Sequence, residues 1–333
     1  MYHKIIHLPE QVILSYNRPK IHKPKNFQEL HLEKISRIVI CGMGGSAISG
    51  DIANAAFGSK LPISVVKDYN IPFLDKKTLV ISISYSGNTE ETLNCTKQAI
   101  SHTEYIGMIT SGGKLKEIAE NKYCWIQLPK DYPPRSAIGF LFFSLMKILE
   151  IFEIIPDHTK AVRAVVANLV KKAGAICNDN PLEKNIAKNS AQQIQGKIPI
   201  IYSSNPQLAP LAYRWKCQFN ENAKYPAFQN TFPEMNHNEI EGWEAVKYKD
   251  IFIPIILTKF NEEPQYKNRI KAFKRILKNS NIKYLEFFAE GDRFIEEIFS
   301  LIYLGDMISY YLAVLENVDP TKIDFIDFLK KEI

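Results

Sequence analysis

The chain has 333 residues, of which 46% are hydrophobic and 23% are charged, and this length allows two cores of ordinary size. The net charge of +6 is the balance of 42 basic and 36 acidic residues spread along the chain, so we expect no nucleic-acid partner. The five cysteines are scattered and lack CxxC spacing, which argues against a zinc site or a disulfide framework and indicates reduced, cytoplasmic thiols.

The sequence predicts neither a targeting segment nor a membrane segment. The first residues lack the apolar stretch of a signal peptide. No apolar run approaches the length of a membrane span, and the most apolar segment, residues 137–155, carries Lys147, Glu150 and Glu153 and is typical of a buried helix. We therefore expect a cytoplasmic protein without a membrane partner.

The first half of the chain alternates between short strands and helices. A proline-broken, helix-rich segment, residues 1–36, comes first. Strands are then predicted at residues 37–41, 63–66, 78–84, 105–109 and 124–128, with intervening helices that end near residues 57, 102 and 121. This alternation predicts a parallel sheet, whose ligands bind at the carboxyl ends of its strands.

The second half repeats this architecture after a junction at residues 154–158. Strands are predicted at residues 198–202, 224–227, 251–257 and 284–288, and helices at 159–179, 182–195, 207–220, 237–247, 263–279, 292–316 and 323–332. We therefore predict an α/β protein of two αβα sandwich domains, residues 1–155 and 156–333, each with a mainly parallel sheet of about five strands.

Two turns at predicted strand ends could bind a ligand. Gly42, Gly44 and Gly45 partly match a dinucleotide-binding GxGxxG motif, but Ala47 stands where the third glycine is expected. A tight turn without a ligand is the ordinary alternative. Ser46 adds a hydroxyl at the start of the following helix, which favours a turn that also binds a ligand.

The turn after residue 83 is more specific. Ser84, Ser86 and Thr89 place three hydroxyls where a strand gives way to a helix, and Gly87 lets the backbone approach a ligand. No lysine follows as in a P-loop, which disfavours a nucleoside triphosphate. Because one hydroxyl is enough to cap a helix, we favour a phosphate monoester as the ligand.

Together the two turns resemble the sugar isomerase (SIS) domain, a fold that binds sugar phosphates. Three later motifs look like the bifunctional phosphoglucose/phosphomannose isomerase family, and the resemblance covers nearly the whole chain. These motifs are Pro133-Pro134-Arg135-Ser136-Ala137, Asn220-Glu221-Asn222-Ala223-Lys224 and Asn236-His237-Asn238-Glu239. The resemblance implies two SIS-type domains that interconvert glucose 6-phosphate and mannose 6-phosphate with fructose 6-phosphate through a cis-enediol. We expect neither a metal nor a cofactor, since His and Cys are dispersed.

The resemblance also implies roles for individual residues. Glu221 is the base that moves a proton between C2 and C1, and Arg135 stabilises the enediolate. His237 assists opening of the sugar ring and reaches across from the partner subunit of a homodimer. For a Glu, Arg or His taken singly, a solvated surface position is the ordinary alternative, although the two prolines before Arg135 make that loop rigid.

The remaining predicted contacts hold the substrate. Gly45, Ser46, Ser84, Ser86 and Thr89 hold the phosphate. By resemblance, the terminal helix contributes Thr321 and a lysine, for which we select Lys330 and keep Lys322 as a rival. Ile323, Ile326 and Leu329 are spaced as a buried face of that helix.

Three other classes of protein share parts of this pattern. A sugar-phosphate sensor would use the same phosphate cradle without chemistry and remains the main alternative, although residues 1–36 are too short and broken for a DNA-binding helix-turn-helix. A glucosamine phosphate synthase needs a catalytic N-terminal cysteine domain, whereas the first cysteine, Cys41, lies in a strand. An NAD-dependent oxidoreductase would use the turn at Gly42.

Overall fold

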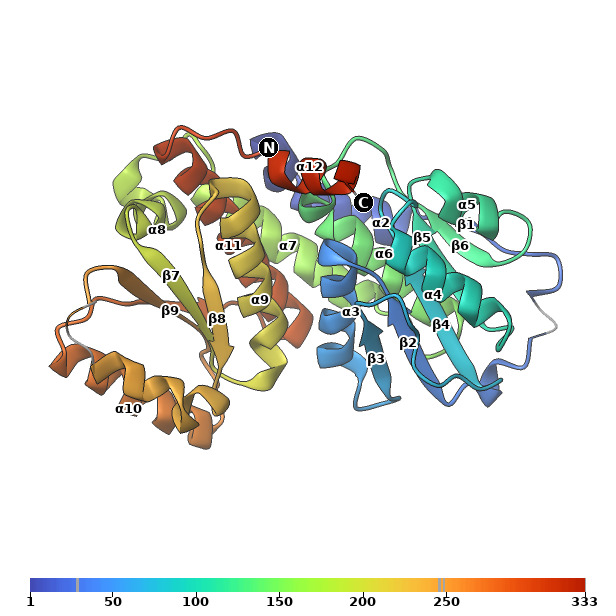
Figure 1. Cartoon of the computed structure of the whole chain (residues 1–333), viewed down its shortest axis with the longest axis horizontal. Helices are drawn as coiled ribbons and strands as arrows, with labels where there is room; N and C mark the ends of the chain where they lie inside the picture. The colour runs from blue at the N-terminus through green and yellow to red at the C-terminus, as the bar shows by residue number, and fades with distance from the viewer. Residues whose placement is uncertain (28–29, 245–246, 248, 333) are drawn as a thin grey trace. The chain divides into compact units, whose positions relative to one another are not determined.

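The computed structural model describes residues 1–27, 30–244, 247 and 249–332. The chain forms two compact units. One is His7–Val166, and the other combines Met1–Ile6 with Ala167–Ile333. Each unit has its own sheet (Figure 1), and we call them the N-terminal and the C-terminal unit.

In the described part of the N-terminal unit, six strands form a sheet in the order β1-β6-β5-β4-β2-β3. Only β1 runs antiparallel to its neighbour among these strands. The central strands β4 and β5 are buried along their whole length, as apolar strands of a parallel sheet are. The strands are β1 Lys20–His22, β2 Arg37–Cys41, β3 Ile63–Val66, β4 Thr78–Ile83, β5 Ile106–Thr110 and β6 Cys124–Gln127.

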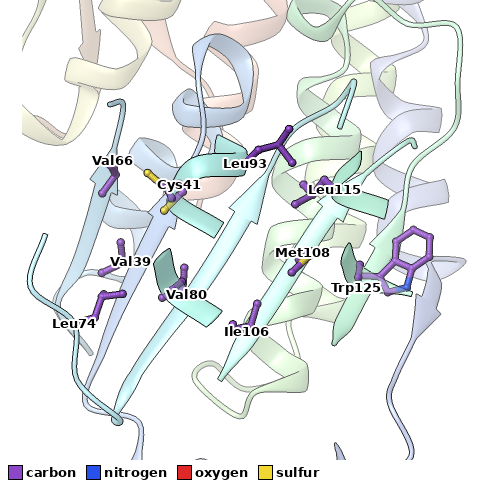
Figure 2. Packing of buried hydrophobic residues seen from close by; sticks show 13 residues of the cluster. Val39, Cys41, Val66, Leu74, Val80, Leu93, Ile106, Met108, Leu115 and Trp125 are labelled. Carbon is purple, nitrogen blue, oxygen red and sulfur yellow. The ribbon is translucent and has the colours of Figure 1, made fainter. Parts of the chain in front are cut away.

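Helices cover both faces of this sheet, as the alternation of side chains along its strands requires. On one face, α4 and α5 pack over a cluster that includes Val39, Val80, Met108 and Trp125 (Figure 2). On the other face lie α3 and α6, with α2 packed on α6. The helices are α2 Leu8–Asn17, α3 Gly44–Phe57, α4 Glu90–Ile100, α5 Gly113–Ala119 and α6 Ile138–Ile151.

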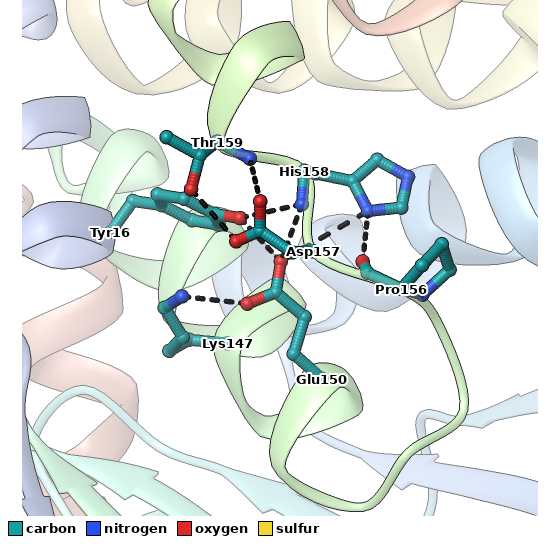
Figure 3. Close-up of polar contacts among 7 residues, drawn as sticks. All are labelled: Tyr16, Lys147, Glu150, Pro156, Asp157, His158 and Thr159. Carbon is teal, nitrogen blue, oxygen red and sulfur yellow. Dashed lines mark hydrogen bonds and ion pairs between the residues drawn. The ribbon is translucent and has the colours of Figure 1, made fainter.

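A polar network joins α2, the end of α6 and the turn before the next helix, α7 (Thr159–Ile176) (Figure 3). The Tyr16 hydroxyl donates to the Glu150 carboxylate, and the His158 amide donates to Tyr16 Oη at 2.9 Å. Lys147 Nζ lies 2.6 Å from Glu150 Oε2 and 4.0 Å above the Tyr16 ring centroid. Burial and the adjacent Glu150 carboxylate raise the pKa of Tyr16, so its hydroxyl stays protonated as a donor.

The described residues of the C-terminal unit contain a four-stranded parallel sheet in the order β10-β9-β7-β8. One face packs against α10 through Phe273 and Leu277, and the other contacts α9 and α11. The strands are β7 Ile198–Ser203, β8 Phe228–Thr231, β9 Phe252–Lys259 and β10 Leu285–Ala289. The helices are α1 Tyr2–Ile6, α8 Ile186–Ile194, α9 Ala209–Gln218, α10 Pro264–Asn279, α11 Phe294–Leu315 and α12 Asp324–Glu332.

The predicted α/β class with mainly parallel sheets is confirmed, with corrections to single elements. The strand predicted at 224–227 is wrong, because residues Phe219–Ala223 continue α9 as a π-helix and the strand begins only at Phe228. The helix predicted at 237–247 is instead the 3-10 segments Glu234–His237 and Glu239–Glu244, and residues 245 and 246 lie outside the described residues.

Two predictions about apolar helices are also wrong. Contrary to our expectation, α11 is long and apolar enough to cross a membrane by length and composition alone, yet most of it is buried inside the protein. On α12, the predicted buried face is exposed, with Ile326 at 40% and Leu329 at 57%. The amphipathic pattern marks the apolar side of a helix but does not supply the surface that covers it.

Candidate functional site

The turn that follows β4 combines hydroxyl groups with backbone amides. Ser84 is buried, and its Oγ lies 2.9 Å from Thr89 Oγ1 and 3.0 Å from the Gly87 amide nitrogen. Gly87 has a φ of +73°, and a Cβ there would lie 1.7 Å from the Gly112 carbonyl oxygen, so this position requires glycine. Within the described residues the Thr89 side chain bonds to Ser84 and does not cap α4, so the positive end of this helix can attract an anion.

A second loop braces this turn. Ser86 is exposed at the tip of the turn, where its Oγ accepts the Asn88 N–H at 3.2 Å. Asn88 Oδ1 accepts the Lys114 N–H at 3.1 Å, and a Cβ on Gly113 would lie 2.6 Å from the Ser86 carbonyl oxygen. Neither Asn88 nor Gly113 is among the predicted site residues. The available signal was the Gly112-Gly113 pair, which follows the neighbouring strand β5.

The glycine turn between β2 and α3 contacts the end of β4. A Cβ on Gly42 would lie 3.0 Å from the Ile83 carbonyl oxygen, and a Cβ on Gly45 would lie 3.0 Å from the Pro134 carbonyl oxygen. Ser46, in the first turn of α3, is 4% exposed. Because β2 and β4 are neighbours in the sheet, the structure brings the two predicted turns and the proline loop together.

Arg135 places a positive charge in this region. It lies in the 3-10 turn Pro134–Ser136 and is only 5% exposed. The turn is held by Gln11, whose Nε2 donates to the Ser136 carbonyl oxygen at 2.8 Å. A guanidinium stays charged when buried, so Arg135 and the starts of α3 and α4 give this end of the sheet a positive potential.

Tyr85 fixes the segment that leads to Arg135. Its hydroxyl donates to the Pro129 carbonyl oxygen at 2.6 Å and accepts the Tyr132 N–H at 3.1 Å. Burial raises the pKa of Tyr85 to about 12. The side chain therefore remains a neutral donor across the physiological range.

In the C-terminal unit, Glu221 lies on the π-helix that extends α9. Such irregular turns are frequent at functional sites. Glu221 is partly buried, and its neighbours on the turn are anchored on both sides. Asn220 Nδ2 donates to the Tyr225 carbonyl oxygen at 2.7 Å, and Asn222 Nδ2 donates to Ser309 Oγ of α11 at 2.9 Å.

Lys224 joins the Glu221 turn to the segment before α12. Its backbone is left-handed, with a φ of 60°, and its Nζ donates to the carbonyl oxygens of Glu221, Asp319 and Lys322 at 2.7, 2.9 and 2.8 Å. A pocket of about 540 Å³ opens beside these contacts. Glu221 and Lys322 line it together with the first residues of α12.

The other residues predicted for this unit lie elsewhere. Among the described residues, neither His237 nor Lys330 lines the Glu221 pocket. His237 is exposed at the end of a 3-10 segment, and Lys330 is exposed in the last turn of α12. The Thr321 hydroxyl donates to Asp319 Oδ1 at 2.5 Å, and this hydrogen bond lowers the pKa of Asp319.

A buried charged group lies beneath the Glu221 turn. Asp306 of α11 pairs with Arg214 of α9 at 2.5 Å, and its second oxygen accepts Gln218 Nε2 at 2.7 Å. Burial raises the pKa of Asp306, and the Arg214 charge opposes that shift. Ser309 Oγ donates to the Asp306 carbonyl oxygen at 2.8 Å, which links the pair to the Glu221 turn through Asn222. This pair is not among the predicted site residues, although an aspartate inside the apolar helix α11 was a signal for it.

Metal ligands do not gather in the part of the chain that the structure describes. No group of three or more His, Cys, Asp or Glu side chains there is placed to hold a metal ion. The groups that the structure does assemble are a cradle of hydroxyls and amides in one unit and a carboxylate beside a pocket in the other.

Comparison with known proteins places the sequence among sugar-phosphate enzymes. Residues 183–333 match the family described as bacterial phospho-glucose isomerase C-terminal SIS domain. A bifunctional phosphoglucose/phosphomannose isomerase of Caldicellulosiruptor bescii is 36% identical, over 100% of this chain and 98% of that protein. The protein of the same description from Thermoplasma acidophilum is 39% identical over 90% of each chain. A D-glucosamine-6-phosphate 4-epimerase of Sulfolobus acidocaldarius is 36% identical over 75% of this chain and 79% of that protein.

Solved structures share the fold at low sequence identity. A hypothetical protein of Thermus thermophilus superposes with a TM-score of 0.76 and 16% identity, over 98% of this chain and 88% of that one. The tagatose-6-phosphate ketose/aldose isomerase of Escherichia coli superposes with a TM-score of 0.73 and 18% identity, over 96% and 95% of the two chains. At these identities the likeness concerns the fold alone.

Proposed function

Because this chain belongs to the bifunctional phosphoglucose/phosphomannose isomerase family, we propose that it interconverts glucose 6-phosphate and mannose 6-phosphate with fructose 6-phosphate. The observation that carries the proposal is the partly buried Glu221 carboxylate, held on a π-helix at the edge of a pocket. A sugar-phosphate sensor would need the cradle but not this carboxylate. The substrates are thus hexose 6-phosphates, and we propose that the enzyme acts in the cytoplasm without metal, cofactor, nucleic acid or membrane.

The 6-phosphate is held in the N-terminal unit. Ser46, Ser84, Ser86 and Thr89 donate to its oxygens, and the starts of α3 and α4 complement its charge. Gly45 lets the backbone approach. The pairing of Thr89 with Ser84, instead of a helix cap, supports this assignment because it gathers both hydroxyls on one turn at the start of α4.

Proton transfer belongs to Glu221. Its carboxylate removes the proton from C2 of the aldose, and the resulting cis-enediol receives that proton at C1. Arg135 stabilises the negative charge that develops on the enediolate oxygens. Glucose and mannose phosphates differ only in the configuration at C2, so one base serves both when the enediol rotates about its C2–C3 bond.

The remaining roles belong to His237, Thr321 and a lysine of the C-terminal segment. His237 assists opening of the closed sugar ring by moving a proton between O1 and O5, and it acts in the partner subunit of a homodimer. Its exposure is compatible with that role. Thr321 and a lysine of the C-terminal segment contact the substrate. Lys330 remains a candidate. Lys322 is favoured over it because Lys322 lines the same pocket as Glu221.

The decisive test is formation of fructose 6-phosphate from each aldose phosphate, measured with EDTA present. We expect turnover of both sugars by the wild-type enzyme and its loss in Glu221→Gln, with phosphate binding retained. The matched control is Glu183→Gln, an exposed carboxylate of the same unit. Failure of the wild-type enzyme on both aldoses would refute the proposed reaction, and epimerisation of glucosamine 6-phosphate would assign the chain to the chemistry of its other relative.

A further inference from the structure

The C-terminal unit has a second groove, between α10 and the edge strand β10. It encloses about 460 Å³, which is a typical volume for a small-molecule site. None of its lining residues lines the Glu221 pocket. Figure 1 shows α10 at the end of this unit opposite α12. The groove is therefore separate from Glu221 and from α12.

The groove carries an excess of positive charge. Helix α10 has six lysines and arginines and no acidic residue, and it places Lys267, Lys271 and Arg275 four residues apart, where like charges repel one another. Two carboxylates line the groove, and both are engaged. Glu286 pairs with Lys274 at 2.6 Å, and Glu262 accepts Asn205 Nδ2 at 3.0 Å. A bound anion would offset the repulsion that remains.

An exposed aromatic pair lies in the same groove. The Phe260 side chain follows β9 and is 63% exposed, and its ring stacks on Phe288 of β10 with centroids 4.7 Å apart and planes 15° apart. Alternation along β10 puts Phe288 on the same face as Glu286, and thus beside Lys274. A large aromatic ring in solvent next to cations is suited to stack on a flat, uncharged ring of a ligand.

We propose that this groove binds a nucleoside polyphosphate, with the base stacked on Phe260 and the phosphates on Lys271, Arg275 and Lys278. The combination of an aromatic platform with several cations selects a ligand that has both a flat ring and multiple negative charges. The limited volume, and the confinement of the cations to one 16-residue helix, favour a single nucleotide over a nucleic-acid strand.

The test is titration calorimetry of the full chain with ATP, adenosine and inorganic tripolyphosphate. We expect ATP to bind more tightly than either part alone. Loss of base stacking in Phe260→Ala should weaken ATP binding by about tenfold or more, and the double variant Lys271→Glu, Arg275→Glu should abolish it. The control is Arg269→Glu, which reverses a charge on the same helix outside the groove and should bind ATP like the wild type.

Four results would overturn the proposal. Undetectable ATP binding, or equal binding by the Phe260 and charge-reversal variants and the wild type, would exclude the groove as the site. Loss of binding in Ser84→Ala, Thr89→Ala instead would place the nucleotide in the hydroxyl cradle. Equal affinity for tripolyphosphate would reduce the groove to a polyanion site, and much tighter binding of single-stranded RNA would make it a nucleic-acid surface. Unchanged circular dichroism would verify that the variants fold.

Discussion

Individual side chains give the most direct tests of phosphate binding. Thr89 Oγ1 lies 2.9 Å from Ser84 Oγ at the start of α4. Thr89→Val keeps the shape of the side chain and removes the hydroxyl, so we expect KM to rise roughly tenfold with kcat nearly unchanged, because the phosphate is bound alike in the ground and transition states. Steady-state kinetics with Ser101→Ala as control would check this. A fall in kcat at constant KM would contradict it.

His237 should affect only the step before isomerisation. If it opens the ring, His237→Ala should slow turnover of closed-ring hexose phosphates by about a hundredfold and leave an open-chain analogue nearly unaffected. Stopped-flow comparison of the two substrates measures this difference. The same loss on both substrates would remove the ring-opening role. Asn238→Ala, a change at the next exposed residue, is the control.

Tyr85 predicts a pH dependence of stability. Its pKa is raised from 10.0 to about 12, so between these values the unfolded chain binds fewer protons than the folded chain and stability falls as pH rises. The contribution of the Tyr85 hydroxyl is therefore complete below pH 10 and lost as pH approaches 12. Urea unfolding of the wild type and Tyr85→Phe should differ by about 1 kcal/mol at pH 8 and by less at pH 11. A constant difference would show that the hydroxyl does not titrate in this way.

At the scale of elements, the Glu221 turn depends on α11. Ser309→Ala removes the hydroxyl that accepts Asn222 Nδ2 and should release the π-helix, so we expect kcat to fall about tenfold with a smaller change in KM. Ser300→Ala is a matched control, because this buried serine of the same helix bonds to Glu290 N and Glu297 O instead. Both variants should lose about 1–3 kcal/mol of stability. An equal loss of kcat in both would mean that Ser309 serves stability alone.

The sequence was informative wherever a local signal decided the structure. Residues 37–41 and 63–66 are strands as predicted, since short β-branched runs bounded by turns have few alternatives. The exposed strand β1 has no apolar run, and it pairs with β6 through its backbone and through the stack of His22 on Trp125, a contact that no local pattern marks. The π-helix was missed for the same reason, because it depends on anchors such as Ser309 that lie 87 residues away from Asn222.

In the candidate site, too, the features with a local sequence signal were predicted and those that depend on long-range contacts were not. The density of hydroxyls after β4 located the cradle, and the expected parallel sheet placed both turns at the carboxyl ends of its strands. The direct pairing of β2 with β4 is a finding of the structure. The lysine of the C-terminal segment could not be chosen from sequence. Lys322 lines the pocket because Lys224 holds its carbonyl oxygen, a contact across 98 residues, and the spacing of apolar residues had favoured Lys330.

At the scale of the whole molecule, the proposed homodimer leads to a prediction that no single variant can test. On closed-ring substrates Glu221→Gln should be inactive and His237→Ala should be about a hundredfold slower than the wild type. If His237 serves the partner's site, a heterodimer of the two variants has one site with both lesions and one with none. Mixing the variants under conditions of subunit exchange should then restore about a quarter of wild-type activity, since about half of the dimers are mixed and each has one intact site.

This mixing experiment distinguishes a dimer in which His237 acts in the partner's site from a dimer in which His237 acts in its own chain. If His237 acted within its own chain, every site in every mixed dimer would carry one lesion, and no activity would return. Mass spectrometry of isotopically labelled chains would verify that exchange occurred, and a mixture of Glu221→Gln with Glu221→Gln, His237→Ala should stay inactive under either arrangement. Full exchange without recovery would therefore leave the enzyme a dimer with independent sites and would withdraw the role of His237 in the partner subunit.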